Sequence, residues 1–326
     1  MSNDVFDITM LSNNKAKVFV AYTIVVPEAD VLKSICGTND SNLKLIEEHL
    51  GVSVFCTGNE ISIENDDKEI TDKFRFIIDR LSDEIADGND GDIIHSILNL
   101  KGTSLSAVSI NIPGSLKKIL PKTANQAALM SALRSYDIVF AEGPAGSGKT
   151  YLAMAEALWE VLTHKKNGIV LTRPVVEAGE NLGFLPGDLE DKINPYLRPL
   201  YDAMNTLLPR ETVKRLSESG VIEIAPLAYM RGRTINNSVI ILDEAQNTTR
   251  EQMKMFLTRM GEDSKVFVTG DVTQVDLPSR VPSGLIQAME LLSKISEIKI
   301  MRLTSDDVVR NPLVKKIVQA YEYAGQ

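Results

Sequence analysis

One glycine-rich stretch constrains the fold of this chain more than any other feature: Gly143-Pro144-Ala145-Gly146-Ser147-Gly148-Lys149-Thr150. An apolar run at 138–141 precedes it, and a segment with helical spacing follows from about 149 to 163. This is the order of strand, glycine-rich turn and helix that the pattern G-x-x-x-x-G-K-[ST] requires. Glycines let successive backbone N–H groups converge on a phosphate, and a helix N-terminus favours the anion further. The stretch therefore predicts a phosphate-binding loop within an α/β fold.

Two side chains of this loop have predicted roles in binding a nucleotide. Lys149 is expected to reach the β and γ phosphates, and the Thr150 hydroxyl is expected to ligate Mg²⁺. The alternative is a chance glycine-rich turn between a strand and a helix. The strand before the loop and the helix after it both favour the phosphate-binding interpretation.

From residue 121 onward, apolar strand-like runs alternate with helical segments, a pattern typical of a parallel sheet covered by helices. The sequence predicts strands at 138–141, 168–172, 221–225, 239–242, 265–269 and 298–302. The helices between them are predicted to begin near residues 149, 187, 211, 249, 283 and 311. Ligands of such folds bind at the carboxyl ends of the strands, so the site is expected there.

The first third of the chain predicts a separate, small α+β domain. Its expected order is β-α-α-β-β-α, with elements at 17–26, 30–36, 41–50, 52–56, 60–64 and 67–81. We expect this domain to span residues 1–105 and a linker to span 106–120. The nucleotide-binding domain is then predicted to occupy 121–326.

The net charge of −9 is unevenly distributed. Residues 1–112 contain 9 Lys and Arg against 19 Asp and Glu, a balance of −10, whereas residues 113–326 contain 26 against 25. The chain contains no apolar run of membrane-spanning length, and its first residues do not resemble a signal peptide. Its two cysteines, Cys36 and Cys56, form no zinc-binding pattern and suit a reducing compartment. These features predict a cytoplasmic protein with no membrane partner.

An acidic pair follows one of the predicted buried strands. Residues 239–242 are apolar, and Asp243 and Glu244 come directly after them. Next to bound phosphates, Asp243 is expected to hold Mg²⁺, and Glu244 to orient or deprotonate the attacking water. The alternative is an acidic helix N-terminus after a core strand. The combination with the phosphate loop favours the catalytic interpretation.

A second polar strand end lies at 270–274. Asp271 and Gln274 follow the apolar run 266–269, and beside Asp243 they could sense the γ phosphate. A simple turn built from Thr, Gly and Asp is the alternative.

Gln126, shortly before the first strand of the sheet, could hydrogen-bond the edge of adenine as donor and acceptor together. A solvent-exposed helical glutamine is the alternative interpretation. The Asn-Lys-x-Asp sequence that recognises guanine is absent, which favours ATP over GTP.

Three arginines are candidates for contacts with a nucleic-acid backbone. Arg173 follows the second strand of the sheet, where it could pair with phosphate or with Glu177 or Glu180. Arg231 and Arg233 flank a glycine and could clamp a backbone, although isolated pairs of this kind usually lie in solvated loops.

Arg310, near the start of the last predicted helix, is a candidate for an arginine finger, which can act on a neighbouring molecule. An ion pair with Asp306 or Asp307 is an equal alternative.

Seven stretches of the second domain together resemble the PhoH family of P-loop ATPases: GPAGSGKT at 143–150, LTRPVVEAGENLGFLPG at 171–187, NPYLRPLYDAM at 194–204, IAPLAYMRGRT at 224–234, ILDEAQNTT at 241–249, GDVTQVDLP at 270–278 and VVRNPLV at 308–314. That family is similar to superfamily 1 helicases, and the stretch GDVTQVDLP resembles the third motif of those helicases. The resemblance implies a RecA-like domain that hydrolyses ATP, with RNA as the macromolecular ligand. It also supports Gln126 as an adenine contact, Gln274 as a γ-phosphate or coupling residue, and Arg173 as a nucleic-acid contact.

The first domain also resembles the family, whose members have a KH-like region here, in ICGTNDSNLKLIEEHLGV at 35–52 and in Gly58-Asn59. It departs from the family at Thr57, where an arginine is usual, and no G-x-x-G occurs in it. Such loops clamp a nucleic-acid backbone, and an acidic domain is a poor phosphate binder. We therefore expect this domain to contact a protein partner or neighbouring subunits.

The ATPase part of about 205 residues is enough for one RecA-like lobe, whereas a superfamily 1 motor uses two. If Arg310 acts as a finger, a neighbouring copy supplies it, which predicts a ring-like homo-oligomer such as a hexamer.

The first function predicted is an RNA-linked ATPase that remodels or unwinds RNA. The alternative is an ATP-switched assembly factor acting on a ribosomal or nuclease protein partner. A small-molecule kinase is disfavoured, because kinases exclude water whereas Glu244 is placed to activate it.

Overall fold

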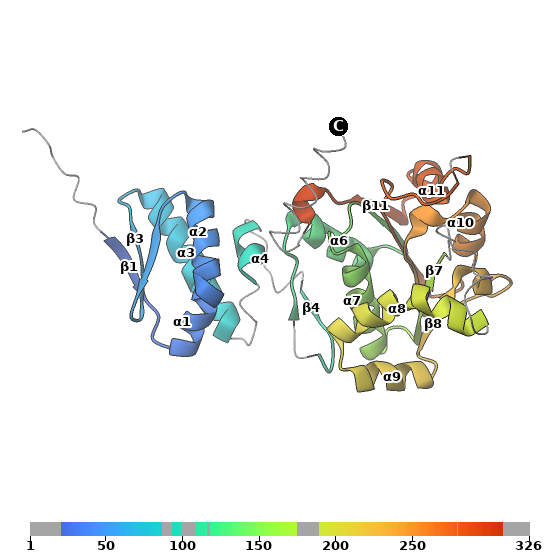
Figure 1. Ribbon diagram of the computed structural model, residues 1–326, viewed down its shortest axis with the longest axis horizontal. Coiled ribbons are helices and arrows are strands. Elements are labelled where there is room, and N and C mark those ends of the chain that lie inside the picture. Colours follow the sequence, from blue (N-terminus) through green and yellow to red (C-terminus); the bar gives the residue numbers. More distant parts are fainter. Residues whose placement is uncertain are drawn as a thin grey trace, which may run out of the picture. The chain divides into compact units, whose positions relative to one another are not determined.

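The computed structural model describes residues 21–86, 93–99, 109–115, 118–174, 189–278 and 280–308 (Figure 1). The chain separates into two compact units, Met1–Ile94 and His95–Gln326. The boundary predicted near residue 105 stays a prediction, because residues 100–108 lie outside the described part. No helix within the described residues is both long and apolar enough to cross a membrane.

The first unit is a three-stranded antiparallel sheet, ordered β1-β3-β2, packed against helices. Its elements are β1 Ala21–Val25, α1 Ala29–Cys36, η1 Thr38–Asp40, α2 Ser41–Leu50, β2 Val54–Thr57, β3 Glu60–Glu64 and α3 Lys68–Ala86. Ile61 and Ile63 of β3 are fully buried, and the residues between and beside them are more exposed, as the two-residue period of a strand requires. The order of elements is the predicted one. The KH-like assignment of this unit stays a prediction.

The second unit contains a six-stranded sheet ordered β11-β6-β10-β9-β7-β8, in which every neighbouring pair is parallel. The strands are β6 Ile138–Glu142, β7 Gly168–Arg173, β8 Ile222–Pro226, β9 Ser238–Leu242, β10 Lys265–Gly270 and β11 Ile298–Arg302. The helices are α4 Ile94–Asn99, α6 Ala124–Ser135, α7 Lys149–Leu162, α8 Leu189–Leu207, α9 Arg210–Glu218, η4 Leu227–Met230, η5 Ala245–Asn247, α10 Arg250–Leu257, α11 Gly284–Leu292 and η6 Ser305–Asp307. The predicted parallel α/β architecture is confirmed.

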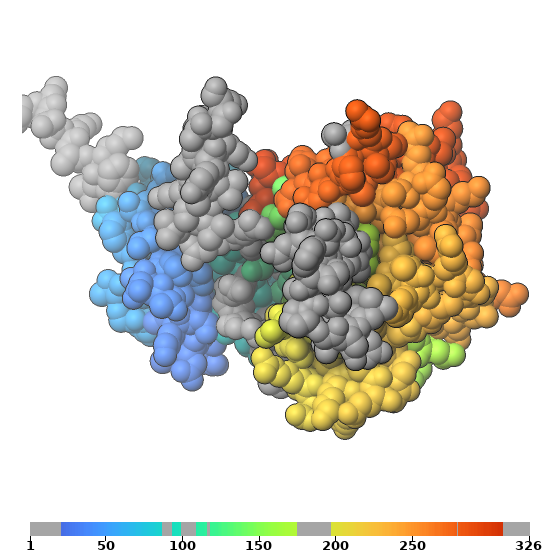
Figure 2. Space-filling model, turned by 45° about the vertical axis from the view of Figure 1, so that its right-hand side comes forward, coloured from blue at the N-terminus to red at the C-terminus, as the bar shows by residue number. Residues whose placement is uncertain are grey.

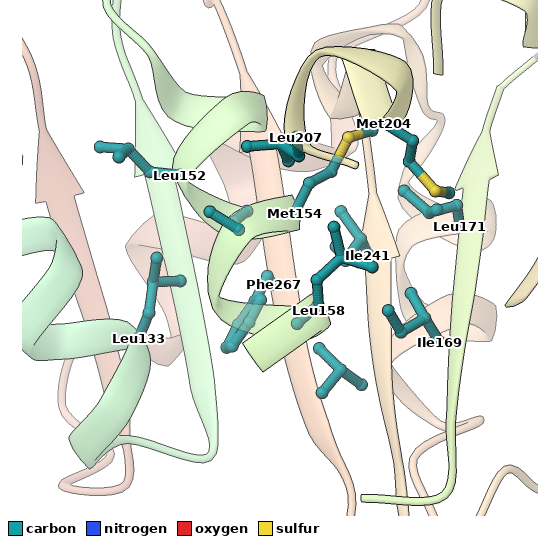
Figure 3. Packing of buried hydrophobic residues seen from close by; sticks show 14 of the residues in the cluster. Leu133, Leu152, Met154, Leu158, Ile169, Leu171, Met204, Leu207, Ile241 and Phe267 are labelled. Carbon is teal, nitrogen blue, oxygen red and sulfur yellow. The ribbon is translucent and has the colours of Figure 1, made fainter. Parts of the chain in front are cut away.

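Helices cover both faces of this sheet. Alternate residues of β9 point to opposite faces, so Val239 and Ile241 belong to one hydrophobic cluster and Ile240 and Leu242 to the other. The first cluster includes residues of α6, α7, α8 and α9 and is shown in Figure 3. The second includes residues of η4, α10 and α11. In Figure 2, α9 (yellow) and α11 (dark orange) lie at opposite ends of the visible face of this unit.

A short two-stranded ladder, β4 Ile110–Asn111 with β5 Lys118–Ile119, lies within the predicted linker. Ile110 and Ile112 are fully buried, and with Ile119 they join the cluster that contains α6 and α7. The described residues of this segment are therefore packed parts of the second unit.

The order of the strands in the sheet determines which parts of the site lie next to each other. β10 lies between β6, which leads into the phosphate loop, and β9, which leads into Asp243. The carboxyl end of β10 is thus inserted between the two predicted parts of the site. The apolar runs of the sequence predict the strands but not their order in the sheet.

Candidate phosphate-binding site

The phosphate loop, Gly143–Thr150, connects β6 to α7, and its path depends on glycine. Gly146 and Gly148 have φ angles of 84° and 89°, in the left-handed region that other residues rarely adopt. At Gly143, an added Cβ would lie 2.6 Å from the carbonyl oxygen of Leu303. The first glycine therefore permits close contact between the loop and the segment that follows β11.

Lys149 lies buried under the loop, with 8% of its surface exposed. Its Nζ donates to the carbonyl oxygens of Gly143 at 2.6 Å and Pro144 at 2.8 Å. Burial lowers the pKa of Lys149, and the carboxylates of Asp271 and Asp243 oppose this effect. The ammonium group is thus held at the base of the loop, close to acidic side chains.

Asp243 joins three segments of the chain. It follows β9, is 7% exposed, and its Oδ1 accepts hydrogen bonds from Thr150 Oγ1 at 2.6 Å and from Thr269 Oγ1 at 2.8 Å. Thr269, at the end of β10, was not among the residues predicted for the site. Its only signal in the sequence was its position at the end of a buried strand next to Asp271.

Glu244 has a φ of 52°, which is unusual for a residue other than glycine and marks a locally strained backbone. Its Oε1 lies 3.2 Å from a guanidinium nitrogen of Arg173, and its Oε2 accepts from Gln246 Nε2 at 2.6 Å. Arg173 therefore pairs with Glu244. The other acids considered as its partners, at 177 and 180, lie outside the described residues.

Asp271 links the end of β10 to the phosphate loop. Its Oδ2 accepts from the Ala145 N–H at 3.1 Å and from Gln274 Nε2 at 2.8 Å. The Asp271 N–H in turn donates to Gln246 Oε1 at 3.0 Å. Gln246, which sequence reasoning missed, thus connects the segment carrying Glu244 to the tip of β10.

These residues surround one pocket of about 300 Å³. Its lining includes residues of the phosphate loop, the acidic pair after β9 and the tip of β10: Ala145, Gly146, Gly148, Lys149, Thr150, Tyr151, Ala203, Asp243, Glu244, Gly270, Asp271 and Gln274. The structure therefore brings together the predicted residues from three separate stretches of sequence.

Gln126 lies next to the loop rather than in the lining of this pocket. It is 5% exposed, its Nε2 donates to the Ser147 carbonyl oxygen at 3.0 Å, and its Oε1 accepts from the Lys122 N–H at 2.7 Å. The bond to Ser147 ties α6 to the phosphate loop, and the bond from Lys122 ties α6 to the segment before it. The role of Gln126 as an adenine contact stays a prediction.

Asp307, which was considered only as a partner for Arg310, fixes the start of α6. Its Oδ1 accepts from Thr123 Oγ1 at 2.5 Å, and its Oδ2 accepts from Asn125 Nδ2 at 2.9 Å and from the Thr304 N–H at 2.6 Å. Burial by itself raises the pKa of Asp307, but these hydrogen bonds outweigh it and leave the pKa below its ordinary value. Arg310 lies outside the described residues.

Arg231 and Arg233 have different surroundings. Arg233 forms a bidentate pair with Glu223, at 2.6 and 2.7 Å, and this pair raises the pKa of Arg233. Arg231 is exposed. Of the two predicted nucleic-acid contacts, Arg233 already has a carboxylate partner.

Comparison with known proteins relates most of the chain to one family. The family model described as PhoH-like protein matches residues 118–322. A PhoH-like protein of Bacillus subtilis (strain 168) is 46% identical over 303 residues, covering 90% of this chain and 94% of the relative. A PhoH-like protein of Mycobacterium tuberculosis (strain ATCC 25618 / H37Rv) is 47% identical over 310 residues, covering 93% and 88%.

Among solved structures, the Pif1 helicase from Candida albicans aligns with 60% of this chain and 42% of its own. Its TM-score of 0.33 and identity of 15% are too low to support an argument about this protein. The family model, in contrast, covers more than half of the chain, and both relatives align with about nine-tenths of it. This chain belongs to the PhoH-like protein family.

Proposed function

We propose that this PhoH-like protein binds ATP with Mg²⁺ at the phosphate loop, hydrolyses it, and couples hydrolysis to RNA. The observation that carries this proposal is the convergence of three segments on one oxygen atom, Asp243 Oδ1, which accepts from both Thr150 and Thr269. A purely structural turn after β9 would not require a buried carboxylate at the mouth of a glycine-rich loop. A nucleotide site that holds a divalent cation would.

The residues present fit Mg²⁺. Thr150 Oγ1 and Asp243 Oδ1 are hard oxygen donors 2.6 Å apart, beside the loop. Mg²⁺ is commonly held by one or two such protein groups together with phosphate oxygens, rather than by a cage of protein ligands. When bound, it supplies charge neutralisation at the phosphate oxygens.

Glu244 is the proposed base, or orienting group, for the attacking water. Arg173 and Gln246 hold its two carboxylate oxygens, and its left-handed backbone fixes the direction of the side chain. A water near the pocket could donate to this carboxylate while its lone pair faces the γ phosphate.

Lys149, the loop N–H groups and Gln274 are proposed to bind the phosphates. Lys149 and the Ala145 N–H lie at the pocket and are available for exchange of their present hydrogen-bond partners. Fixed positive groups at developing negative charge lower the barrier to phosphoryl transfer. We assign ATP rather than GTP on the sequence grounds given above, with Gln126 as the proposed adenine contact.

RNA is proposed as the macromolecular ligand, with Arg231 and Arg173 as candidate contacts. Arg231 is the more available of these, because it is exposed, whereas Arg173 is less exposed and pairs with Glu244. We further propose that a RecA-like lobe of this kind works in a ring-like homo-oligomer, in which Arg310 of one copy completes the site of the next.

Two observations favour a second candidate, an ATP-switched factor that acts on a ribosomal or nuclease protein. Arg173 and Arg233 are both engaged by carboxylates, and residues 1–112 have a balance of −10. Both features reduce attraction to an RNA backbone and suit a protein partner instead.

The deciding experiment is steady-state ATP hydrolysis with and without single-stranded RNA. Lys149→Ala is the control for activity of this site. A several-fold stimulation that Lys149→Ala abolishes and Arg231→Ala weakens supports the RNA-coupled ATPase. Arg210→Ala, which removes another exposed arginine, is the matched control and is expected to leave the stimulation unchanged. Hydrolysis that Lys149→Ala abolishes but RNA does not stimulate favours the ATP-switched factor. If Lys149→Ala has no effect on hydrolysis, or no hydrolysis is found, both candidate functions are contradicted.

The assignment of Glu244 has its own test. Glu244→Gln keeps the size of the side chain and removes the base, so the variant is expected to bind ATP and retain it unhydrolysed. Single-turnover hydrolysis and nucleotide retention on the purified protein measure this. Normal turnover by Glu244→Gln would remove Glu244 from the mechanism.

A further inference from the structure

The two cysteines of the chain lie side by side in the first unit. Cys36 is the last residue of α1, and Cys56 lies in β2, twenty positions later. The Sγ of Cys36 donates to the Sγ of Cys56 at 3.6 Å. Because the sequence contains only these two cysteines, each thiol has one potential partner within the chain.

The two thiols differ in accessibility. Cys36 is 8% exposed, whereas Cys56 is exposed. Burial, then the hydrogen bond and charge of Cys56, raise the pKa of Cys36 to about 12. Near neutral pH Cys36 therefore stays protonated, and a reagent in solution meets Cys56 first.

The local fold allows the sulfur atoms to approach each other. A disulfide requires a separation of about 2.05 Å, so the present 3.6 Å must close by roughly 1.5 Å. β2 is an edge strand that pairs with β3, and Cys56 lies on the same face of the strand as buried Val54, although Cys56 itself is exposed. Movement of this edge toward the end of α1 leaves the β1–β3 pairing in place.

We propose that Cys36 and Cys56 form a reversible intramolecular disulfide by exchange with a low-molecular-weight disulfide such as oxidised glutathione. In the first step the Cys56 thiolate attacks one sulfur of that disulfide, forming a mixed disulfide and releasing one thiol. In the second, Cys36 loses its proton and attacks Cys56 Sγ, which forms the Cys36–Cys56 bond and releases a second thiol. Both cysteines are oxidised, and one small disulfide is reduced to two thiols.

The bond would close a loop that contains the whole of α2. It would fix the end of α1 to β2 and restrain the turn Gly37–Asp40, in which Asn39 and Asp40 have positive φ angles. The modification site is therefore placed to set the rigidity of the α1–α2 turn.

The test treats the full-length protein with excess oxidised glutathione and measures its intact mass without reduction. The expected product is two hydrogens lighter than the starting protein, lacks glutathione, and yields a linked peptide pair containing Cys36 and Cys56. Dithiothreitol restores the original mass. The second step is expected to accelerate as pH rises, because Cys36 must ionise.

Matched serine variants separate the two steps. Cys36→Ser is expected to stop at one glutathione bound to Cys56, and Cys56→Ser is expected to keep its mass because the remaining thiol is buried. The urea midpoint of wild-type protein should rise on oxidation, and that of Cys36→Ser should not. A persistent glutathione adduct on the wild type, two free thiols after treatment, or a bond between two chains would overturn the proposal.

Discussion

The two ends of the six-stranded sheet both contain buried charges, but they neutralise them differently. At the amino ends of the strands, Glu156 has a fully buried side chain and lies 3.3 Å from the guanidinium of Arg134. Beside it, Lys265 at the start of β10 lies 2.7 Å from Glu160. Both of these carboxylates, Glu156 and Glu160, therefore have a cationic partner within the protein.

At the carboxyl ends, Asp243 and Lys149 lie in the same pocket without such pairing. Asp243 accepts from two hydroxyl groups, and Lys149 donates to two carbonyl groups and, more distantly, to a hydroxyl. Within the described part of the chain, no lysine or arginine forms an ion pair with Asp243. At this end of the sheet, Asp243 and Lys149 are thus hydrogen-bonded to neutral groups rather than held in ion pairs, although Glu244 beside them pairs with Arg173.

The difference between the two ends of the sheet suggests that one set of charges serves folding and the other serves the reaction. Buried charge without a counter-charge lowers stability, so it is retained where a ligand or the chemistry supplies the compensation. We expect the ion pairs at the amino ends of the strands to contribute to the free energy of unfolding and not to the rate of ATP hydrolysis. We expect Asp243 and Lys149, at the carboxyl ends, to contribute to the rate of hydrolysis and not to the free energy of unfolding.

The largest expected effect is that of Asp243→Asn on hydrolysis. Loss of the carboxylate charge should lower kcat at least a hundredfold, about 3 kcal/mol of transition-state stabilisation. The free energy of unfolding should change by less than about 1 kcal/mol, or rise, because a buried unpaired charge is removed. Urea unfolding and ATP hydrolysis of the same preparation measure both quantities, and a strongly destabilised variant would contradict the contrast.

Glu156→Ala should have the opposite profile. Removing one partner leaves the Arg134 guanidinium partly buried without its carboxylate, at a cost of about 3 kcal/mol in the free energy of unfolding. Hydrolysis per folded molecule should stay within about twofold, since the pair lies at the end of the sheet away from the pocket. Glu156→Gln, which keeps hydrogen-bonding atoms, is the matched control and should lose less stability. A large fall in kcat with unchanged stability would mean that the paired end takes part in turnover.

The smallest expected effect is that of Asp307→Asn on the free energy of unfolding, and it depends most strongly on pH. Its depressed pKa means that the folded state favours the carboxylate, so its contribution is complete above the unfolded pKa of about 3.9 and is lost as pH falls further. Asp307→Asn should therefore lower the free energy of unfolding by about 2 kcal/mol near pH 7. This difference from the wild type should shrink below about pH 4. Urea titrations across this range measure it, and a difference independent of pH would exclude the carboxylate charge as the cause.

Much of the architecture could be predicted from local sequence, because strands and glycine turns leave local signals. All six strands of the parallel sheet begin within one residue of their predicted positions. The apolar run ending in Asp243 and Glu244 indicated both the strand β9 and the site at its end. Such features depend on residues that are adjacent in the chain.

The parts of the site that could not be predicted depend on which distant segments meet. Thr269 contacts Asp243 only because β10 is inserted between β6 and β9, and Asp307 reaches α6 across 182 positions to Asn125. Arg173 had nearby acids in sequence, yet Glu244, 71 positions away, is its partner in the described residues. Pairings of this kind arise from strand order, which the spacing of apolar residues does not encode.

The hydrogen bonds already present in the phosphate loop have a kinetic consequence. Lys149 donates to carbonyl groups of its own loop, and the Ala145 N–H donates to Asp271. A phosphate that takes these hydrogens exchanges bonds rather than adding them, so it gains only the difference between the two sets. The protein partners can recapture the same hydrogens as the phosphate departs, which lowers the barrier to release. For the proposed ATP, a loop bonded in this way would favour repeated turnover over long retention of the nucleotide.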